Sequence, residues 1–430
     1  MWTGKACVDF SPTAFPTQRP TSAPTAFDCS NAATLSGCRR TLKYRKNCQW
    51  SSSEKTCKPR NFCVKTFKSN CLKIDGCKWT SDVKSVGKFC AQCAEGDDDA
   101  DCYKWTSYRD SLAYPAAARH HPITFSDGST FGYVMAGITG TFDMWKINHE
   151  TKKWTSISST AKNIPPPREY AYGVAIDKIA YMGFGIASND ERNGLRDWYS
   201  YDMDKNEFKK LADLPAQGAA RWHPAIVAVE AKRFSSKEWF IVVSCGSSRT
   251  DGNLKDTWEY RVKTNTWTKR PDIPGPPRHH PFYFDAKTTS GKHFAYVGFG
   301  HAYREDGYVL RDLYRYDVIS KKWNEMKLFP GEGRVAGTQF SFHYSSTKSR
   351  GYLLSGDGDN HGPMETGELW EYDPNGDSWK ELAPHPGNSL WAPGSFVINC
   401  DVYLTSGYDR KAKKRLNTGY TFTLPECENN

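Results

Sequence analysis

Five arginines recur at one position of a long repeat and are the side chains in this sequence best suited to bind an anion. They are Arg119, Arg168, Arg221, Arg278 and Arg334. Arginine presents a planar fork of donors that matches a carboxylate or sulfate through two parallel hydrogen bonds. We therefore expect a ligand-binding set or, alternatively, five braces that each hold a neighbouring segment through a carboxylate or a backbone carbonyl.

Three histidines and one tryptophan accompany the arginines. His121, His223 and His280 each stand two residues after an arginine, and Trp391 lies near the sixth equivalent position. Like charges repel, so arginines gathered in one place need an anion or carboxylates nearby. The combined set predicts recognition of an acidic ligand.

The other chemical motifs argue against catalysis and against a metal. Asp357, Asp359, Gly362 and Glu368 fall on positions one, three, six and twelve of a calcium loop, but position five is His361, where an EF-hand loop needs an oxygen ligand. The flanks are strand-like, whereas an EF-hand needs helices. No G-x-S-x-G elbow or phosphate-binding loop occurs in the chain. We expect no catalytic residues, no metal and no cofactor.

The elements that position these residues form a repeat of 48 to 61 residues, which begins at about residue 101. Each unit has four strand-like runs, and the arginine precedes the first run. The second run ends at a glycine in all six units: Gly137, Gly185, Gly246, Gly300, Gly356 and Gly407. The third run carries two aromatic residues two positions apart, as at Tyr314 and Tyr316, and the fourth centres on an aromatic residue such as Trp323. A period of this length is typical of a β-propeller.

This pattern resembles the kelch family of β-propellers, whose blades are four-stranded antiparallel sheets around a central channel. The resemblance covers residues 101–427 and implies an all-β fold. One difference is systematic, because the first glycine of the family's Gly-Gly pair is replaced in every unit. The replacements are Ala136, Phe184, Cys245, Phe299, Ser355 and Ser406.

The chain ends imply how the ring closes. Six second strands are present, but only five units contain a fourth strand, and the run around Trp105 reads like the fourth strand around Trp154. We therefore expect six blades, the last closed by one N-terminal strand, which leaves no free sheet edge. Cys102 and Cys427 fall where the missing hairpin turn would be, so we predict a disulfide between them, with Cys245 and Cys400 as free thiols.

The kelch resemblance also implies where ligands bind. In that family the arginine position and the loops after the second strand form the ligand face. These loops are long and polar here, which favours recognition; they include 188–194, 249–253, 303–307, 357–361 and 409–415. Some kelch-type propellers are copper oxidases with a crosslinked Tyr–Cys site, but Cys245 occupies a position held elsewhere by core residues, so we expect a buried structural thiol.

The front of the chain has a different composition. Of the 14 cysteines, 11 lie in the first 102 residues, where no histidine occurs and Cys90/Cys93 is the only C-x-x-C, so disulfides are favoured over zinc. Residues 1–27 read as a Pro-Thr spacer, 28–93 as two Cys-rich modules that resemble extracellular PSI modules, 94–100 as an acidic linker and 101–430 as the propeller. The basic charge is confined to the front, with 16 Lys/Arg against five Asp/Glu up to Cys90.

These observations predict an extracellular, non-enzymatic binding or scaffold protein. The expected partners are an acidic glycan or an acidic protein segment for the arginine set, and polyanions for the basic front modules. The alternatives are a structural building block of an extracellular matrix, coat or appendage, which would self-assemble, and a kelch-type sugar isomerase or oxidase. We expect no nucleic-acid partner and no membrane span.

Overall fold

A computed structural model describes residues 48–51, 56–59, 105–107, 113–138, 142–187, 190–233, 236–303, 308–385 and 387–424. The chain divides into two compact units, Met1–Cys102 and Tyr103–Asn430. In the first unit, β1 (Cys48–Ser51) and β2 (Thr56–Pro59) pair as an antiparallel ribbon. The Pro-Thr spacer, the acidic linker and the rest of the Cys-rich modules lie outside the described residues.

The described part of the second unit contains six four-stranded antiparallel sheets, here numbered one to six in chain order. Sheet one is β4 (Ile123–Ser126), β5 (Phe131–Met135), β6 (Met144–Asn148) and β7 (Trp154–Ser156), and sheet two is β9 (Tyr172–Ile176), β10 (Ile179–Gly183), β13 (Trp198–Asp202) and β14 (Glu207–Lys210). Sheet three is β15 (Ala225–Arg233), β16 (Ser236–Ser244), β19 (Thr257–Arg261) and β20 (Thr266–Arg270), and sheet four is β21 (Phe282–Lys287), β22 (His293–Gly298), β23 (Leu313–Asp317) and β24 (Lys322–Glu325). Sheet five is β25 (Thr338–His343), β26 (Ser349–Leu354), β27 (Gly367–Asp373) and β28 (Ser378–His385), and sheet six is β30 (Gly394–Ile398), β31 (Asp401–Thr405), β34 (Gly419–Thr423) and β3 (Thr106–Ser107).

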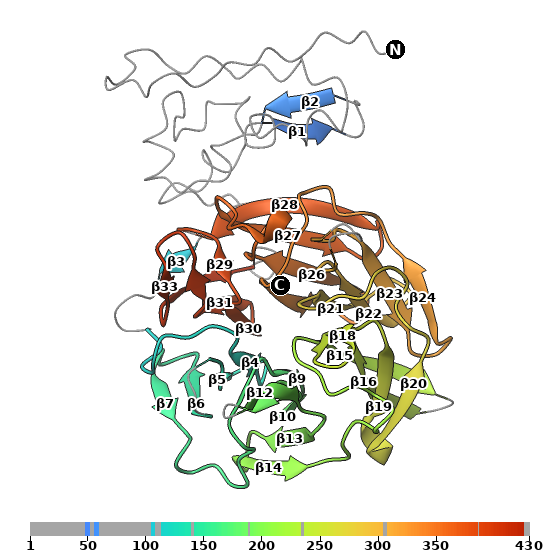
Figure 1. Cartoon of the computed structure of the whole chain (residues 1–430). Coiled ribbons are helices and arrows are strands. Elements are labelled where there is room, and N and C mark those ends of the chain that lie inside the picture. The colour runs from blue at the N-terminus through green and yellow to red at the C-terminus, as the bar shows by residue number, and fades with distance from the viewer. Residues whose placement is uncertain are drawn as a thin grey trace. The chain divides into compact units, whose positions relative to one another are not determined.

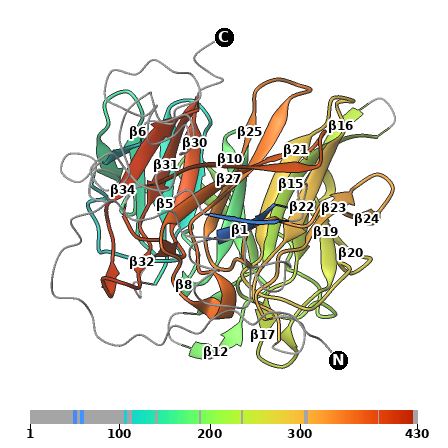
Figure 2. The same ribbon diagram turned by 90° about the horizontal axis from the view of Figure 1, so that it is seen from above.

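The first strand of each sheet lies nearest the centre of a ring (Figure 1). Small additional sheets form in the loops after the second strands: β8 (Arg168–Glu169) with β11 (Ile186–Ala187) and β12 (Asp190–Gly194), β17 (Ser247–Ser248) with β18 (Gly252–Asn253), and β29 (Leu390–Trp391) with β32 (Tyr408–Asp409) and β33 (Lys414–Arg415). Seen from above, β8, β12 and β17 lie toward one face of the ring, and the β15–β16 and β25–β26 hairpins reach the other (Figure 2). The described residues contain no α-helix, and so no helix that could cross a membrane was found among them.

Sheet six combines the two ends of the second unit. The N-terminal strand β3 pairs with β34, Thr106 opposite Thr421 and Ser107 opposite Tyr420. Trp105 packs on Phe422 with ring centroids 4.1 Å apart, just as Trp379 packs on Tyr372 at 4.8 Å in sheet five. The N-terminal strand therefore takes the fourth position of the last sheet, as the sequence repeat predicts.

Six hydrophobic clusters join each sheet to the next. Phe125 of sheet one packs with Tyr201 of sheet two, and corresponding clusters follow around the ring. The last cluster joins sheet six to sheet one through Phe396 and Val134. Because sheets six and one share a core as the others do, the ring is closed and exposes no free sheet face at a seam.

Two left-handed residues end each second strand. The residue that replaces the first glycine has φ between 51° and 63°, and the glycine after it has φ between 86° and 103°. The first value lies in the left-handed region that non-glycine residues tolerate at a cost, but at Gly185 a Cβ atom would come within 2.3 Å of the Glu169 carbonyl oxygen. The amide of Gly407 in sheet six donates to the Arg119 carbonyl in sheet one at 2.8 Å, a bond repeated between other neighbouring sheets. The second position is thus a glycine because only glycine leaves room for this close backbone contact. The first position makes no such contact and accepts other residues.

Candidate functional site in the central channel

The five repeated arginines form buried ion pairs inside their own sheets. Arg221 donates from Nη1 and Nη2 to the two oxygens of Asp256, both at 2.7 Å, and Arg168 binds Asp197 in the same way at 2.6 and 2.8 Å. Each arginine is at most 1% exposed. The pairs are Arg119–Asp143, Arg168–Asp197, Arg221–Asp256, Arg278–Asp312 and Arg334–Glu368.

These contacts correct the prediction that the arginines bind an acidic ligand at an open mouth. The carboxylate that each guanidinium requires is supplied by the chain itself, so the brace alternative describes their position. Burial disfavours the charged form of Asp256, but hydrogen bonding to Arg221 and the charge of Arg221 hold its pKa below its usual value. In sheet six, Leu390 and Thr418 stand where the other units have the arginine and the acid, so neither charge is left unpaired.

The predicted histidines are brought together at the ring axis. His121, His223 and His280, like their equivalents Tyr170, Ala336 and Ala392, have left-handed backbones with φ between 47° and 57°. The His223 and His280 rings stack at 3.4 Å, and His121 Nε2 lies 2.9 Å from His280 Nε2. All three histidines are buried, so the predicted mouth is closed by side chains.

Neighbouring rings complete this closed end. Trp391 packs on His121 at 4.8 Å between ring centroids, and the Nδ1 atoms of His120 and His121 are 2.6 Å apart. Burial lowers the pKa of His121, His223 and His280 well below the usual histidine value. The three imidazoles are therefore neutral at pH 7, and they offer nitrogen lone pairs rather than positive charge.

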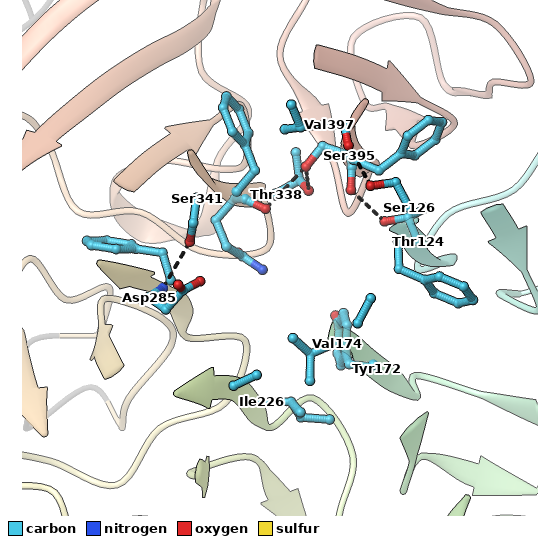
Figure 3. A pocket seen from close by; sticks show the side chains of 18 of the residues that line it. Thr124, Ser126, Tyr172, Val174, Ile226, Asp285, Thr338, Ser341, Ser395 and Val397 are labelled. Carbon is cyan, nitrogen blue, oxygen red and sulfur yellow. Dashed lines mark hydrogen bonds between the residues drawn. The ribbon is translucent and has the colours of Figure 1, made fainter. Parts of the chain in front are cut away.

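Below the histidines lies a cavity of about 430 Å³, lined by the innermost strands of all six sheets. Its lining includes Pro122, Gly337 and Pro393, which directly follow the closed end in sequence, and Asp177 and His343, which are exposed on the opposite face. Figure 3 looks into this cavity, where labelled side chains from all six sheets converge: Thr124, Ser126, Tyr172, Val174, Ile226, Asp285, Thr338, Ser341, Ser395 and Val397. The channel is thus open at the face that the β15–β16 and β25–β26 hairpins reach. It is closed at the face where His121, His223 and His280 meet.

A carboxylate with two histidines lies in the wall of this cavity. Asp285 Oδ2 is 2.6 Å from His293 Nε2 and 2.7 Å from His343 Nε2. His293 Nδ1 accepts a hydrogen bond from the Glu230 amide, so His293 Nε2 carries the proton and donates to Asp285. Burial opposes ionisation of Asp285, but the two histidines outweigh it and hold its pKa well below the usual value. This ionised carboxylate at the cavity wall can accept hydrogen bonds.

The family model described as the Attractin/LZTR1 beta-propeller matches residues 132–411. The chain belongs to this β-propeller family. Among curated relatives of the Attractin/LZTR1-type propeller, N-acetylneuraminate epimerase 1 of Escherichia coli is 23% identical over 279 residues, 63% of this chain and 61% of that protein. Kelch domain-containing protein 10 of Bos taurus and of Homo sapiens is 25% identical over 175 residues, 39% of this chain and 37% of theirs. The chain thus spans less than two thirds of the length of these relatives.

Two further predictions for this Attractin/LZTR1-type propeller concern the calcium-like loop and Cys245. Asp357 binds His361 at 2.7 Å and Arg410 at 3.1 Å, while Glu368 binds Arg334, so these acids already have partners within the protein. Cys245 is a buried free thiol whose pKa is raised to about 11 by burial. The expectation of a buried structural thiol is confirmed.

Cys400 differs from its prediction. It forms a disulfide, so the expectation of a free thiol is wrong. It occupies the turn between β30 and β31, and its carbonyl accepts from the Leu424 amide at 2.9 Å, next to the end of β34. The position of Cys400 in sheet six, as the repeat gives it, does not show this closeness to the C-terminal strand. Cys102 and Cys427 lie outside the described residues.

Several site residues were missed from the sequence. The acids that pair with the arginines recur two positions before the first member of the aromatic pair in the third strand, as in Asp256 before Trp258, and this spacing could have revealed them. Asp285 and His293 lie in sheet four and His343 lies in sheet five. The other sheets do not repeat this combination, so the repeat could not reveal it. The contact of these three residues depends on β21 lying beside β25, which only the ring arrangement shows.

Proposed function

We propose that this protein is a non-enzymatic binding propeller whose channel takes a neutral, hydroxyl-rich group such as a sugar unit. The observation that carries the proposal is the cavity of about 430 Å³, whose described lining contains hydroxyl, amide and carboxylate groups but no lysine or arginine. Ligand sites are usually concave and mostly apolar, with a few converging polar groups.

The lining offers specific contacts for such a ligand. Tyr172 and Tyr283 approach edge to face, with ring centroids 6.4 Å apart, and provide apolar surfaces with polar tips. Asp285 and the hydroxyls of Ser126 and Ser341 supply acceptors and donors around them. With the arginines buried, an acidic glycan would meet carboxylates in this cavity rather than cations, so a neutral ligand is favoured.

Localisation outside the cell remains part of this proposal. It is supported by the cysteine density of the first 102 residues, which is typical of proteins that fold in an oxidising compartment. A ring closed on itself also presents a rigid outer surface on which other proteins could dock, consistent with a scaffold.

A second candidate function is sugar epimerisation. It is favoured by the contact between Asp285 and His343 in the cavity wall and by the similarity to the epimerase. The lowered pKa of Asp285 nevertheless makes this carboxylate a weak base. That relative's name specifies a carboxylate sugar, however, and no arginine or lysine of the described cavity lining would pair with one. Binding therefore remains the first proposal.

The test is a glycan array and calorimetry with the full chain. We expect neutral glycans to bind, Tyr283→Ala and Asp285→Asn to weaken binding at least tenfold, and Tyr303→Ala, an exposed tyrosine outside the cavity lining, to leave it unchanged. Failure to retain any neutral glycan, or stronger binding of acidic ones, would contradict the proposal.

Two further measurements separate the alternatives. Faster exchange between sugar anomers in magnetisation-transfer NMR, lost in Asp285→Asn, would favour the enzyme. Polymers or disulfide-linked oligomers in solution would favour a structural building block, whereas the binding proposal predicts a monodisperse monomer.

A further inference from the structure

Three histidines from different sheets converge at the closed end of the channel. His121 precedes β4, His223 precedes β15 and His280 precedes β21. One ring nitrogen from each lies within 4.8 Å of the other two, and His121 Nε2 and His280 Nε2 are 2.9 Å apart. Around a tetrahedral zinc ion with Zn–N bonds of 2.0 to 2.1 Å, donor nitrogens lie roughly 3.4 Å apart. The nitrogen separations are thus close to those of a zinc site, and the stacked rings of His223 and His280 would have to turn so that their lone pairs point to one centre.

Hydrogen bonding alone does not account for this cluster. It explains His121, whose two ring nitrogens face His120 and His280. It does not explain His223, which is 6% exposed and whose two ring nitrogens both lack a hydrogen-bond partner among the described residues. Buried polar atoms are nearly always paired, so an unpaired imidazole packed against two others indicates a missing ligand.

The surrounding residues suit a bound cation. The Nδ1 atom of His120 lies 2.6 Å from that of His121, so His120 can accept the His121 Nδ1 proton and leave the Nε2 lone pair free. His279 Nδ1 lies 2.7 Å from the Asn253 side-chain oxygen, which fixes the ring beside His280. Such partners orient metal-binding histidines in known sites.

We propose that His121, His223 and His280 bind a divalent transition-metal ion of the zinc class at the closed end of the channel. Three imidazole ligands suit zinc, copper or nickel rather than calcium or magnesium, which prefer oxygen. Three protein ligands leave one coordination position open to water or another ligand. The sequence alone led us to expect no metal, and this proposal does not depend on sugar binding.

The experiment uses the full chain, stripped with a chelator and titrated with Zn²⁺ by calorimetry, with Co²⁺ absorption as a second readout. We expect His223→Phe to bind one Zn²⁺ fewer per chain than the unmodified protein and to lose the visible spectrum of tetrahedral Co²⁺. Phenylalanine keeps an aromatic ring at this left-handed position, as Phe184 and Phe299 do at others, so the fold should persist. We expect His120→Ala to weaken the site by about 10- to 100-fold.

The matched control is His293→Ala, which removes a histidine of the Asp285 cluster and should leave the zinc stoichiometry unchanged. A higher thermal midpoint with Zn²⁺, lost in His223→Phe, would further support the site. Equal stoichiometry in His223→Phe and the unmodified protein would overturn the proposal, as would loss of the ion only in His293→Ala.

Discussion

At the residue scale, the repeated arginines show that one pattern can serve either recognition or stability. Both uses require a guanidinium facing an anion. Here the anion belongs to the same sheet, and Arg221 also donates to the Cys245 carbonyl at 3.1 Å, so the side chain joins the end of the second strand to the start of the third. Its role is therefore to hold the ends of these strands together.

This role predicts an asymmetric double-mutant cycle. Arg221→Leu should lower the free energy of unfolding by about 3 to 5 kcal/mol, because it leaves Asp256 unpaired in a largely buried site. Adding Asp256→Thr should restore more than half of this loss, since it reproduces the Leu390 and Thr418 arrangement of sheet six. Denaturant unfolding measures both, and Arg196→Leu, at an exposed arginine, should change stability by about 0.5 kcal/mol or less. A double variant less stable than Arg221→Leu would contradict the brace.

The two cysteines of known state should react differently. Cys245 should resist alkylation in the native protein, because it is buried and its raised pKa leaves little thiolate at pH 8. Cys400 should become alkylated only after reduction. Mass spectrometry before and after unfolding, with and without reductant, checks both residues. Recovery of unreduced, alkylated Cys400 would show that this disulfide is absent, whereas a Cys102–Cys427 peptide would confirm the pairing predicted from the sequence.

At the element scale, the turn after each second strand explains why one glycine persists and its neighbour varies. The matched pair Gly185→Ala and Gly128→Ala separates the two causes, because their φ angles are similar, 86° and 81°. Gly128 has open space around it, so alanine should cost about 1 to 2 kcal/mol from backbone strain alone. Gly185→Ala should cost roughly twice that or more, because its Cβ would meet the Glu169 carbonyl. Equal losses in thermal unfolding would refute the close-contact explanation.

The closing sheet offers a second test at this scale. Trp105→Ala should destabilise the ring by about 3 kcal/mol and speed hydrogen exchange at Tyr420 and Thr421, because no hairpin turn tethers β3 to β34. Trp379→Ala removes the equivalent ring in sheet five, where a turn joins β27 to β28 and should preserve their pairing. Equal exchange increases in the two variants would show that the closing strand does not depend on this packing.

At the scale of the whole molecule, the positive charge is concentrated near the start of the chain. The chain has a formal net charge of +10, and the excess of Lys/Arg up to Cys90 accounts for it. We predict that the full chain binds a sulfated-polysaccharide column at low salt and elutes as salt screens the contacts, whereas a chain lacking residues 1–100 passes through. Retention that does not weaken with salt would argue against this contact.

The strand order of the ring, its glycine turns and the N-terminal closing strand followed from the sequence alone. They could be predicted because each blade repeats the same local pattern of apolar alternation and turns, and repetition makes weak signals visible. The positions of Arg221 and His223 in their unit could be predicted in the same way. The acids that pair with the arginines recur at an equally regular spacing and could have been predicted as well.

What a side chain faces was decided only by the tertiary structure. Arg221 meets Asp256 of its own sheet rather than solvent. His121, His223 and His280 meet on the axis rather than lining an open mouth, because left-handed turns direct these residues from separate sheets toward one point. The contact of Asp285 with His343 likewise joins two neighbouring sheets. Periodicity gives a residue's place within a blade, but burial and charge pairing arise between segments far apart in sequence, and these determine whether a polar residue stabilises the ring or remains free to bind a ligand.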